Sequence, residues 1–287
     1  LADLRAATDL LRPVWESTRG ADGYASLEVS PHLADDTAAT LREARRLWRS
    51  LDRPNAMIKV PATTAGLPAI STLLAEGINV NVTLLFGRSR YREVVDSFMA
   101  GLERRVEAGG SAEGVASVAS FFVSRIDTFV DARLDALGTA EAGAWRGKAA
   151  IASARLAYAD YREWTESGRW RRLAAPGAQP QRLLWASTST KDPRYEDTRY
   201  VEALIGPQTV NTMPRGTLEA YRDHGRPAVR LEDDVEDARA VLRALSRLGI
   251  DPDEVSRALE REGVRKFVEP FDRLQALLAR RARGDGR

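Results

Sequence analysis

Hydrophobic residues recur along this chain with two different periods. Short runs with a two-residue alternation, or with apolar residues at nearly every position, predict strands, whereas apolar residues spaced three or four apart predict helices. The predicted strands span residues 24–30, 56–60, 78–86, 115–123, 183–187 and 208–213. The predicted helices span residues 1–18, 33–51, 64–76, 88–108, 127–172 (a long and mostly helical insert), 196–205, 215–223, 233–248 and 251–281.

The alternation of strands with helices indicates βα units, a parallel sheet and therefore an α/β fold. A chain of 287 residues has the size of one α/β barrel, so we expect a single domain over residues 1–287. Six strands are predicted, whereas a closed TIM-type (β/α)8 barrel has eight. An open doubly wound sheet fits less well, because no predicted strand leads into a glycine-rich phosphate-binding turn.

The strand at residues 56–60 carries a single lysine, Lys59, among apolar residues. Alternation places Met57 and Lys59 on the face opposite to Ile58. Burial at the end of an apolar strand disfavours the ammonium form of a lysine, which leaves more free amine to attack a carbonyl group. The structural alternative is a lysine that reaches water or lies on an edge strand.

Polar residues also interrupt one face of three other predicted strands, although buried parallel strands are normally apolar on both faces. These residues are Glu28, Asn81 with Thr83, and Ser120 with Ser124. Taken singly, a buried glutamate is more often paired with a cation, and a buried asparagine is more often bonded within the core. Taken together, the residues indicate a reactive barrel mouth, because catalytic groups in such barrels come from the C-terminal ends of several strands.

These residue types permit a specific chemistry. A desolvated lysine can form an imine with a ketone, and the imine acts as an electron sink for cleavage of a carbon–carbon bond. A neighbouring carboxylate can move the protons that imine formation and hydrolysis require, and a threonine can hold the water that relays them. Asparagine and serine side chains can bind sugar hydroxyls.

Two further cations follow strand ends, as a phosphate group would require. Arg125 is out of phase with Ser120 and Phe122, so we expect it just past its strand, and Lys191 lies in the polar turn after residues 183–187. A salt bridge between Arg125 and Asp127 is the structural alternative.

Composition excludes several classes of protein. The chain has 43 basic and 41 acidic residues, and this near balance does not indicate a nucleic-acid partner. With no cysteine and only two histidines, disulfides, thiolate catalysis and Cys- or His-rich metal sites are not expected. No apolar run approaches the length of a membrane span, and no signal-peptide pattern opens the chain, so a cytoplasmic protein without a membrane partner is expected.

Five segments of the chain resemble transaldolases, in the same order and with the same spacing. The resemblance covers nearly the whole chain. The segment at residues 185–193 is similar to the longer bacterial subfamily, which is also found fused to phosphoglucose isomerase. The other four segments are Ser-Leu-Glu-Val-Ser at residues 26–30, Met-Ile-Lys-Val-Pro-Ala-Thr at residues 57–63, and residues 77–86 and 120–127.

The resemblance implies a TIM-type barrel of the class I aldolase kind and three catalytic residues. Lys59 matches the lysine that forms the Schiff base. Glu28 matches the acid/base that acts through a water molecule, and Thr83 matches the residue that orients this water.

The resemblance also implies five substrate-binding residues. Asn81 matches the asparagine that contacts substrate hydroxyls. Ser120 and Arg125 match the phosphate-binding pair, and Phe122 lines the pocket. Lys191 lies where many family members carry another phosphate-binding arginine, so its role is less closely implied.

The family is a group of transferases of the pentose phosphate pathway in carbohydrate metabolism. It moves a dihydroxyacetone unit from sedoheptulose 7-phosphate to glyceraldehyde 3-phosphate, which gives erythrose 4-phosphate and fructose 6-phosphate. The resemblance therefore implies sugar phosphates as partners, with no metal and no organic cofactor. The sequence leaves both a monomer and a homo-oligomer open.

The sequence departs from the family pattern at its start. Transaldolases begin with two strands that carry an aspartate and a Thr-Ser-Asn-Pro turn, and neither segment precedes Leu1. We therefore expect an N-terminally truncated barrel with about six strands. Two alternatives stay open: an inactive remnant that binds sugar phosphates, and a related fructose 6-phosphate aldolase that releases dihydroxyacetone, against which Glu28 argues.

Overall fold

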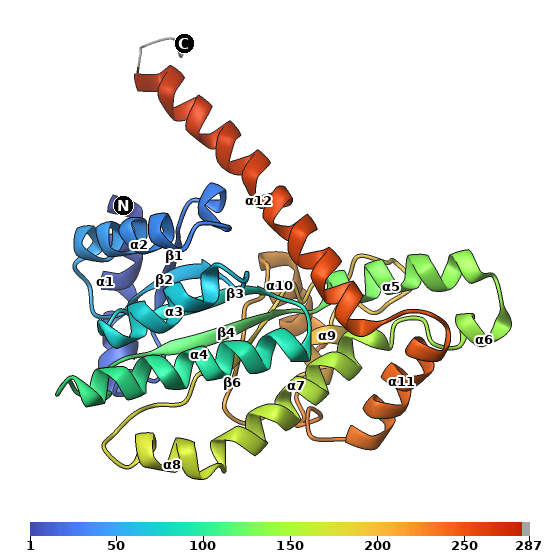
Figure 1. The fold of residues 1–287 in the computed structure, drawn as a ribbon. Helices are drawn as coiled ribbons and strands as arrows, with labels where there is room; N and C mark the ends of the chain where they lie inside the picture. The colour runs from blue at the N-terminus through green and yellow to red at the C-terminus, as the bar shows by residue number, and fades with distance from the viewer. Residues whose placement is uncertain (283–287) are drawn as a thin grey trace.

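A parallel six-stranded sheet lies at the centre of the computed structural model, which describes residues 1–282 (Figure 1). The strands are adjacent in chain order, and each neighbouring pair is parallel. All six strands predicted from the sequence are confirmed. They are β1 (Ala25–Glu28), β2 (Ala56–Pro61), β3 (Val80–Leu85), β4 (Ser117–Phe122), β5 (Arg182–Ala186) and β6 (Thr209–Asn211).

The order of the strands follows from the βα units, because a right-handed crossover through a helix returns the chain beside the strand that it left. This consecutive parallel order is that of a TIM-type barrel. Within residues 1–282, β1 and β6 each have one neighbouring strand, so they form the two edges of the sheet. Every residue of these two strands is partly exposed, whereas β3 and β4 are buried throughout.

The helices precede the first strand, connect the strands and follow the last one. They are α1 (Ala2–Ser17), η1 (Pro31–Leu33, a 3-10 turn), α2 (Thr37–Leu51), α3 (Gly66–Ala75), α4 (Arg88–Glu107), α5 (Ser124–Leu137), α6 (Ala140–Gly143), α7 (Ala149–Thr165), α8 (Gly168–Ala174), α9 (Arg199–Ala203), α10 (Arg215–His224), α11 (Val235–Arg247) and α12 (Pro252–Ala282). No helix in this part of the chain combines the length and the apolar character that a membrane span needs.

Several helix starts differ from the sequence prediction by up to four residues, and two of these differences concern helices that follow strands with candidate site residues. The helix expected from residue 33 begins at Thr37, because the Asp36 side chain accepts a hydrogen bond from the Ala39 amide (2.9 Å) and thereby caps it. The insert expected from residue 127 begins instead at Ser124, directly after β4. Arg125 therefore lies in the first helical turn, just past its strand as predicted.

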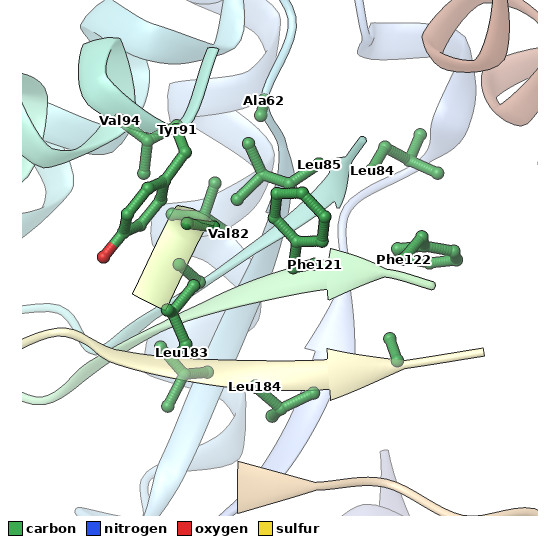
Figure 2. Packing of buried hydrophobic residues seen from close by; sticks show 14 of the residues in the cluster. Ala62, Val82, Leu84, Leu85, Tyr91, Val94, Phe121, Phe122, Leu183 and Leu184 are labelled. Carbon is green, nitrogen blue, oxygen red and sulfur yellow. The ribbon is translucent and has the colours of Figure 1, made fainter. Parts of the chain in front are cut away.

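The core lies between the outer face of the sheet and the surrounding helices. Figure 2 shows Tyr91 of α4 beside Val82 of β3, and both side chains are fully buried. Trp164 and Trp170 are also buried, with ring centroids 5.2 Å apart, so these two tryptophans of the long insert serve core packing as expected. Trp164 Nε1 donates a hydrogen bond to the Tyr91 hydroxyl (3.0 Å), which links α7 to α4.

Candidate active site

Glu28 and Lys59 lie side by side at the ends of β1 and β2. The parallel register pairs the two residues, so their side chains lie on the same face of the sheet. Glu28 Oε2 and Lys59 Nζ are 3.5 Å apart, and the two side chains are 23% and 24% exposed. Burial raises the pKa of the Glu28 carboxyl, although the neighbouring ammonium group opposes the rise. A carboxyl group with a raised pKa is better matched to proton transfer near neutral pH.

Asn81 adjoins Lys59 in the register of β2 and β3. Its Nδ2 donates a hydrogen bond to Ser26 Oγ (3.0 Å), and its Oδ1 accepts one from Ser120 Oγ (2.7 Å). These two bonds fix which end of the amide faces which strand. Ser120 was expected in the phosphate-binding pair, but its hydroxyl here donates to Asn81. Ser26 was not singled out as a site residue, although its alternation with Glu28 placed it on the same face.

Thr83 lies two positions after Asn81 and is fully buried. Its hydroxyl has no hydrogen-bond partner within residues 1–282. The register of β3 shifts between Val82 and Leu85, and Leu84 has a positive φ of 58°. Such irregularities often occur beside active sites, where they re-aim a side chain. A buried hydroxyl with free bonding capacity is suited to hold a water molecule.

Arg125 lies at the start of α5, with its guanidinium carbon 5.5 Å from the ring centroid of Phe122. The alternative salt bridge with Asp127 does not form. The Asp127 carboxylate instead accepts hydrogen bonds from the Ala150 amide (2.7 Å) and the Tyr200 hydroxyl (2.8 Å). Among the described residues, Arg125 has no ion-pair partner within 4.0 Å, so its charge is available to a ligand.

Lys191 lies on the loop between β5 and α9, where its Nζ donates a hydrogen bond to Ser189 Oγ (2.6 Å). Lys191 and Arg125 line the same cavity, a groove of about 580 Å³ between α5 and α12. The structure therefore brings the two predicted phosphate-binding cations together. Lys59 and Asn81 line a different cavity of about 490 Å³ on the inner face of the sheet.

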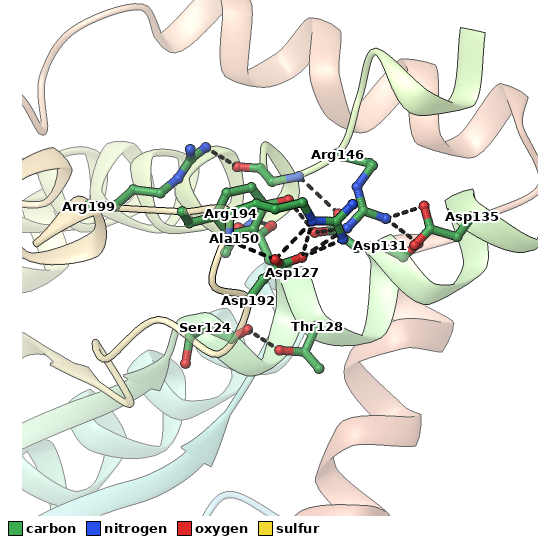
Figure 3. Close-up of polar contacts among 12 residues, drawn as sticks. Ser124, Asp127, Thr128, Asp131, Asp135, Arg146, Ala150, Asp192, Arg194 and Arg199 are labelled. Atoms are coloured by element: carbon green, nitrogen blue, oxygen red, sulfur yellow. Dashed lines mark hydrogen bonds and ion pairs between the residues drawn. The ribbon is translucent and has the colours of Figure 1, made fainter. Parts of the chain in front are cut away.

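A network of charges attaches the Lys191 loop to α5 (Figure 3). Asp192 forms ion pairs with Arg194 (2.6 Å) and with Arg146 (3.1 Å), and Arg146 also pairs with Asp135 of α5. The Arg194 guanidinium holds the pKa of Asp192 below its usual range. Because Asp192 follows Lys191 directly, the network limits how far this loop can move from α5.

Phe267 of α12 is a site residue that the sequence did not indicate. Lys59 Nζ lies 5.7 Å from the centroid of its ring, within the range of a cation–π contact. Nothing in the local helical pattern distinguishes Phe267 from an ordinary core residue. Its place beside the amine follows from the path of α12 across the end of the sheet.

Metal ligation has no candidate in the part of the chain that the structure describes. No group of three or more His, Cys, Asp or Glu side chains among residues 1–282 is arranged to hold a metal ion. The carboxylates Asp131, Asp135 and Asp192 instead surround the Arg146 guanidinium.

Comparison with known proteins gives consistent matches. The family model described as Transaldolase/Fructose-6-phosphate aldolase matches residues 1–278. The transaldolase of Parafrankia sp. (strain EAN1pec) is 57% identical over 274 residues, which are 95% of this chain and 74% of that protein. The transaldolase of Acidothermus cellulolyticus is 55% identical over 97% of this chain and 75% of its own length. The transaldolase of Mycobacterium tuberculosis is 52% identical over 95% of this chain and 74% of its own length.

Proposed function

Because the chain belongs to the transaldolase/fructose-6-phosphate aldolase family, we propose that Lys59, Glu28 and Thr83 carry out its catalysis. Several transaldolases are more than 50% identical to this chain in alignments that cover at least 95% of it. The chain accordingly has transaldolase function: it is a transferase of the pentose phosphate pathway that acts on sugar phosphates.

In the proposed mechanism, the free amine of Lys59 attacks the ketone carbon of the donor, and the resulting carbinolamine loses water to give an imine. The imine accepts the electron pair of the C3–C4 bond as this bond breaks, the C4 hydroxyl gives its proton to a water molecule, and the aldose leaves. With sedoheptulose 7-phosphate as donor, the aldose is erythrose 4-phosphate. The three-carbon enamine on Lys59 then adds to the aldehyde of glyceraldehyde 3-phosphate, whose oxygen takes up a proton from water. Hydrolysis of the new imine releases fructose 6-phosphate and restores the amine.

Glu28 moves the protons of these steps. It donates a proton to the departing hydroxyl of the carbinolamine and takes one from the water that hydrolyses the imine. Thr83 orients this water. The separation of 3.5 Å between Glu28 Oε2 and Lys59 Nζ is the observation that carries the proposal, because it leaves both groups within reach of one carbon and one water molecule.

The substrate extends from Lys59 towards the groove between α5 and α12. Asn81 binds its hydroxyls, while Arg125 and Lys191 bind its phosphate and Phe122 lines the pocket between them. The hydrogen bond from Ser120 to Asn81 supports a role for this serine in orienting the amide. No bound cofactor takes part in the proposed steps.

Borohydride reduction in the presence of fructose 6-phosphate, followed by peptide mass mapping, tests the proposal. We expect a dihydroxyacetone-sized adduct on Lys59 and none in Lys59→Ala. A folded protein without any adduct would refute the mechanism and favour a remnant that only binds sugar phosphates. A coupled assay with and without an aldose acceptor separates transfer from the release of free dihydroxyacetone by an aldolase.

The exposed edge strands β1 and β6 support a further proposal about the barrel. Two more parallel strands outside residues 1–282 would pair with these edges and close the sheet to eight strands. Residues 1–287 would then form part of one barrel domain, similar to the longer bacterial subfamily. We also propose a cytoplasmic location, in keeping with the lack of cysteine in all 287 residues.

A further inference from the structure

Helix α12 crosses the C-terminal ends of the strands and contacts η1, β3 and α5 (Figure 1). Its approach to β3 is close, because a Cβ atom added at Gly263 would lie 2.9 Å from Leu84 Cδ2. His32 of η1 forms a hydrogen bond with Asp272 of α12 (2.7 Å between Nε2 and Oδ1), which ties the helix to the segment that follows β1. The helix is therefore held over the candidate active site from several sides.

One face of α12 contributes residues both near Lys59 and to the groove lined by Arg125 and Lys191. Residues three or four positions apart lie on the same side of a helix. This spacing relates Glu262 to Lys266, and their neighbours Gly263 to Phe267. Phe267 lies beside the Lys59 amine (5.7 Å). Glu262 and Lys266 line the groove that contains the proposed phosphate-binding residues.

The groove has an excess of positive charge. Arg125, Arg133, Lys191 and Lys266 line it, with Glu262 as the one acidic residue among its lining residues. Glu262 forms an ion pair with Lys266, which holds the pKa of its carboxyl below the usual range, and the charge of Arg125 adds to the effect. In the free protein, the carboxylate of Glu262 thus lies against the positive charge of Lys266 in this groove.

We propose that Lys266 is a further phosphate-binding residue, and that Glu262 holds its ammonium group until a sugar phosphate binds. This inference rests on the function proposed above, because it takes Arg125 and Lys191 as the phosphate-binding pair. The Lys266 side chain is 57% exposed, so its flexible stem turns from Glu262 to the phosphate without disturbing the core. The substrate phosphate then has cations on both sides of the groove, from α5 and from α12.

The proposal also gives Glu262 a function. Its carboxylate competes with phosphate for Lys266, so it weakens binding of free phosphate and of short anions that lack a sugar. A substrate whose carbonyl reacts at Lys59 overcomes this competition, because it is anchored at its other end and its phosphate has a high effective concentration in the groove. A sugar phosphate therefore still binds in spite of this competition, whereas inorganic phosphate has no second anchor to offset it.

The test measures donor specificity in the full-length protein, with unphosphorylated glyceraldehyde as acceptor. We expect Lys266→Met to raise KM for fructose 6-phosphate by about ten-fold, the effect of losing one charge-assisted hydrogen bond. The kcat for this donor and the kcat/KM for unphosphorylated fructose should stay within about two-fold. Lys266→Arg should retain most of the affinity for fructose 6-phosphate. Lys148→Met is the matched control, because this lysine lies against Trp145 and outside the groove.

Inhibition by inorganic phosphate provides a second measurement. We expect Glu262→Gln to lower the inhibition constant for phosphate by several-fold, because the competing charge is gone while Lys266 remains. An unchanged inhibition constant in this variant would overturn the proposal. If Lys266→Met does not fold, the inhibition constant of Glu262→Gln still tests whether Lys266 binds phosphate.

Arg125→Met separates a failure of this inference from a failure of the proposed function. If this variant raises KM for fructose 6-phosphate while Lys266→Met does not, Lys266 is no phosphate ligand and the proposed phosphate site stands. If neither variant affects fructose 6-phosphate more strongly than unphosphorylated fructose, the groove is not the phosphate site and that part of the proposed function is wrong. If Lys266→Met lowers kcat for both donors alike, Lys266 acts only in the structure of α12 and the proposal fails.

Discussion

Replacement of Glu28 by glutamine is the sharpest test of the acid/base assignment, because it keeps the size of the side chain and removes its charge. At the observed separation of 3.5 Å, the attraction between carboxylate and ammonium amounts to about 5 kcal/mol at an effective dielectric constant of about 20. Burial nevertheless outweighs this attraction, since the net effect is a raised pKa of Glu28. The structure thus keeps this carboxyl group partly desolvated at a cost in stability.

The pH dependence of this cost follows from the difference between the pKa of Glu28 in the folded and in the unfolded protein. A carboxyl group whose pKa is raised by folding contributes stability below its unfolded pKa, and this contribution is lost as the pH rises through the folded value. At pH 8, the ionised Glu28 side chain therefore destabilises the fold, and Glu28→Gln should be at least as stable as the parent protein. Activity should change in the opposite direction: loss of a general acid/base lowers kcat by about 10² to 10⁴, or about 3 to 5 kcal/mol in activation free energy.

The assay combines turnover of sugar phosphates with urea unfolding at pH 8. In the parent protein, the rate should fall on the acid side through a pKa above that of an ordinary glutamate, and this limb should be absent in Glu28→Gln. Glu43→Gln is the matched control, because Glu43 pairs with Arg46 on the surface of α2, away from the site. Full activity in Glu28→Gln, or a loss of stability in proportion to the loss of activity, would refute the reasoning.

Two further predictions concern the fold around the site. Tyr91→Phe should lower the free energy of unfolding by about 1 to 3 kcal/mol, because it leaves the buried Trp164 Nε1 without its acceptor. This cost should largely vanish in a Trp164→Phe background, and a double-mutant cycle by urea unfolding that gives no coupling energy would contradict the prediction. Burial raises the pKa of Asp127 from 3.8 to about 6, so this carboxyl group contributes stability below pH 3.8 that is lost as the pH rises through about 6. Asp127→Asn should remove this part of the pH dependence in urea-midpoint measurements between pH 4 and pH 7, and an identical slope in both proteins would show that Asp127 does not titrate as inferred.

Much of the candidate site could be predicted from local sequence patterns. Two-residue alternation showed that Lys59 and Asn81 lie on one face of strands whose other face is apolar, and the βα order implied that neighbouring strands are parallel. Parallel neighbours in register bring such residues together, and the structure pairs Glu28 with Lys59 and Lys59 with Asn81. These predictions succeeded because strand periodicity and crossover handedness are properties of the chain over short distances.

Other features depended on contacts that local patterns do not encode. The salt bridge considered for Arg125 and Asp127 does not form, because the Asp127 carboxylate accepts hydrogen bonds from a backbone amide of α7 and from a tyrosine hydroxyl of α9. The serine expected at the phosphate, Ser120, bonds to Asn81 on the next strand. In both cases the sequence showed a group that needs a partner, and only the packed fold determined which partner lies within reach.

The sequence by itself determined the six strands, the helices between them and the polar residues on the inner face, because these follow from residue type and spacing. The tertiary structure alone decided that α12 passes over the strand ends. It thereby placed Phe267 beside Lys59, and Lys266 in the groove that Arg125 also lines. A helical pattern specifies which of its residues share a face, but the contacts that this face makes depend on how the whole chain packs, since burial of apolar surface favours contact without specifying a partner.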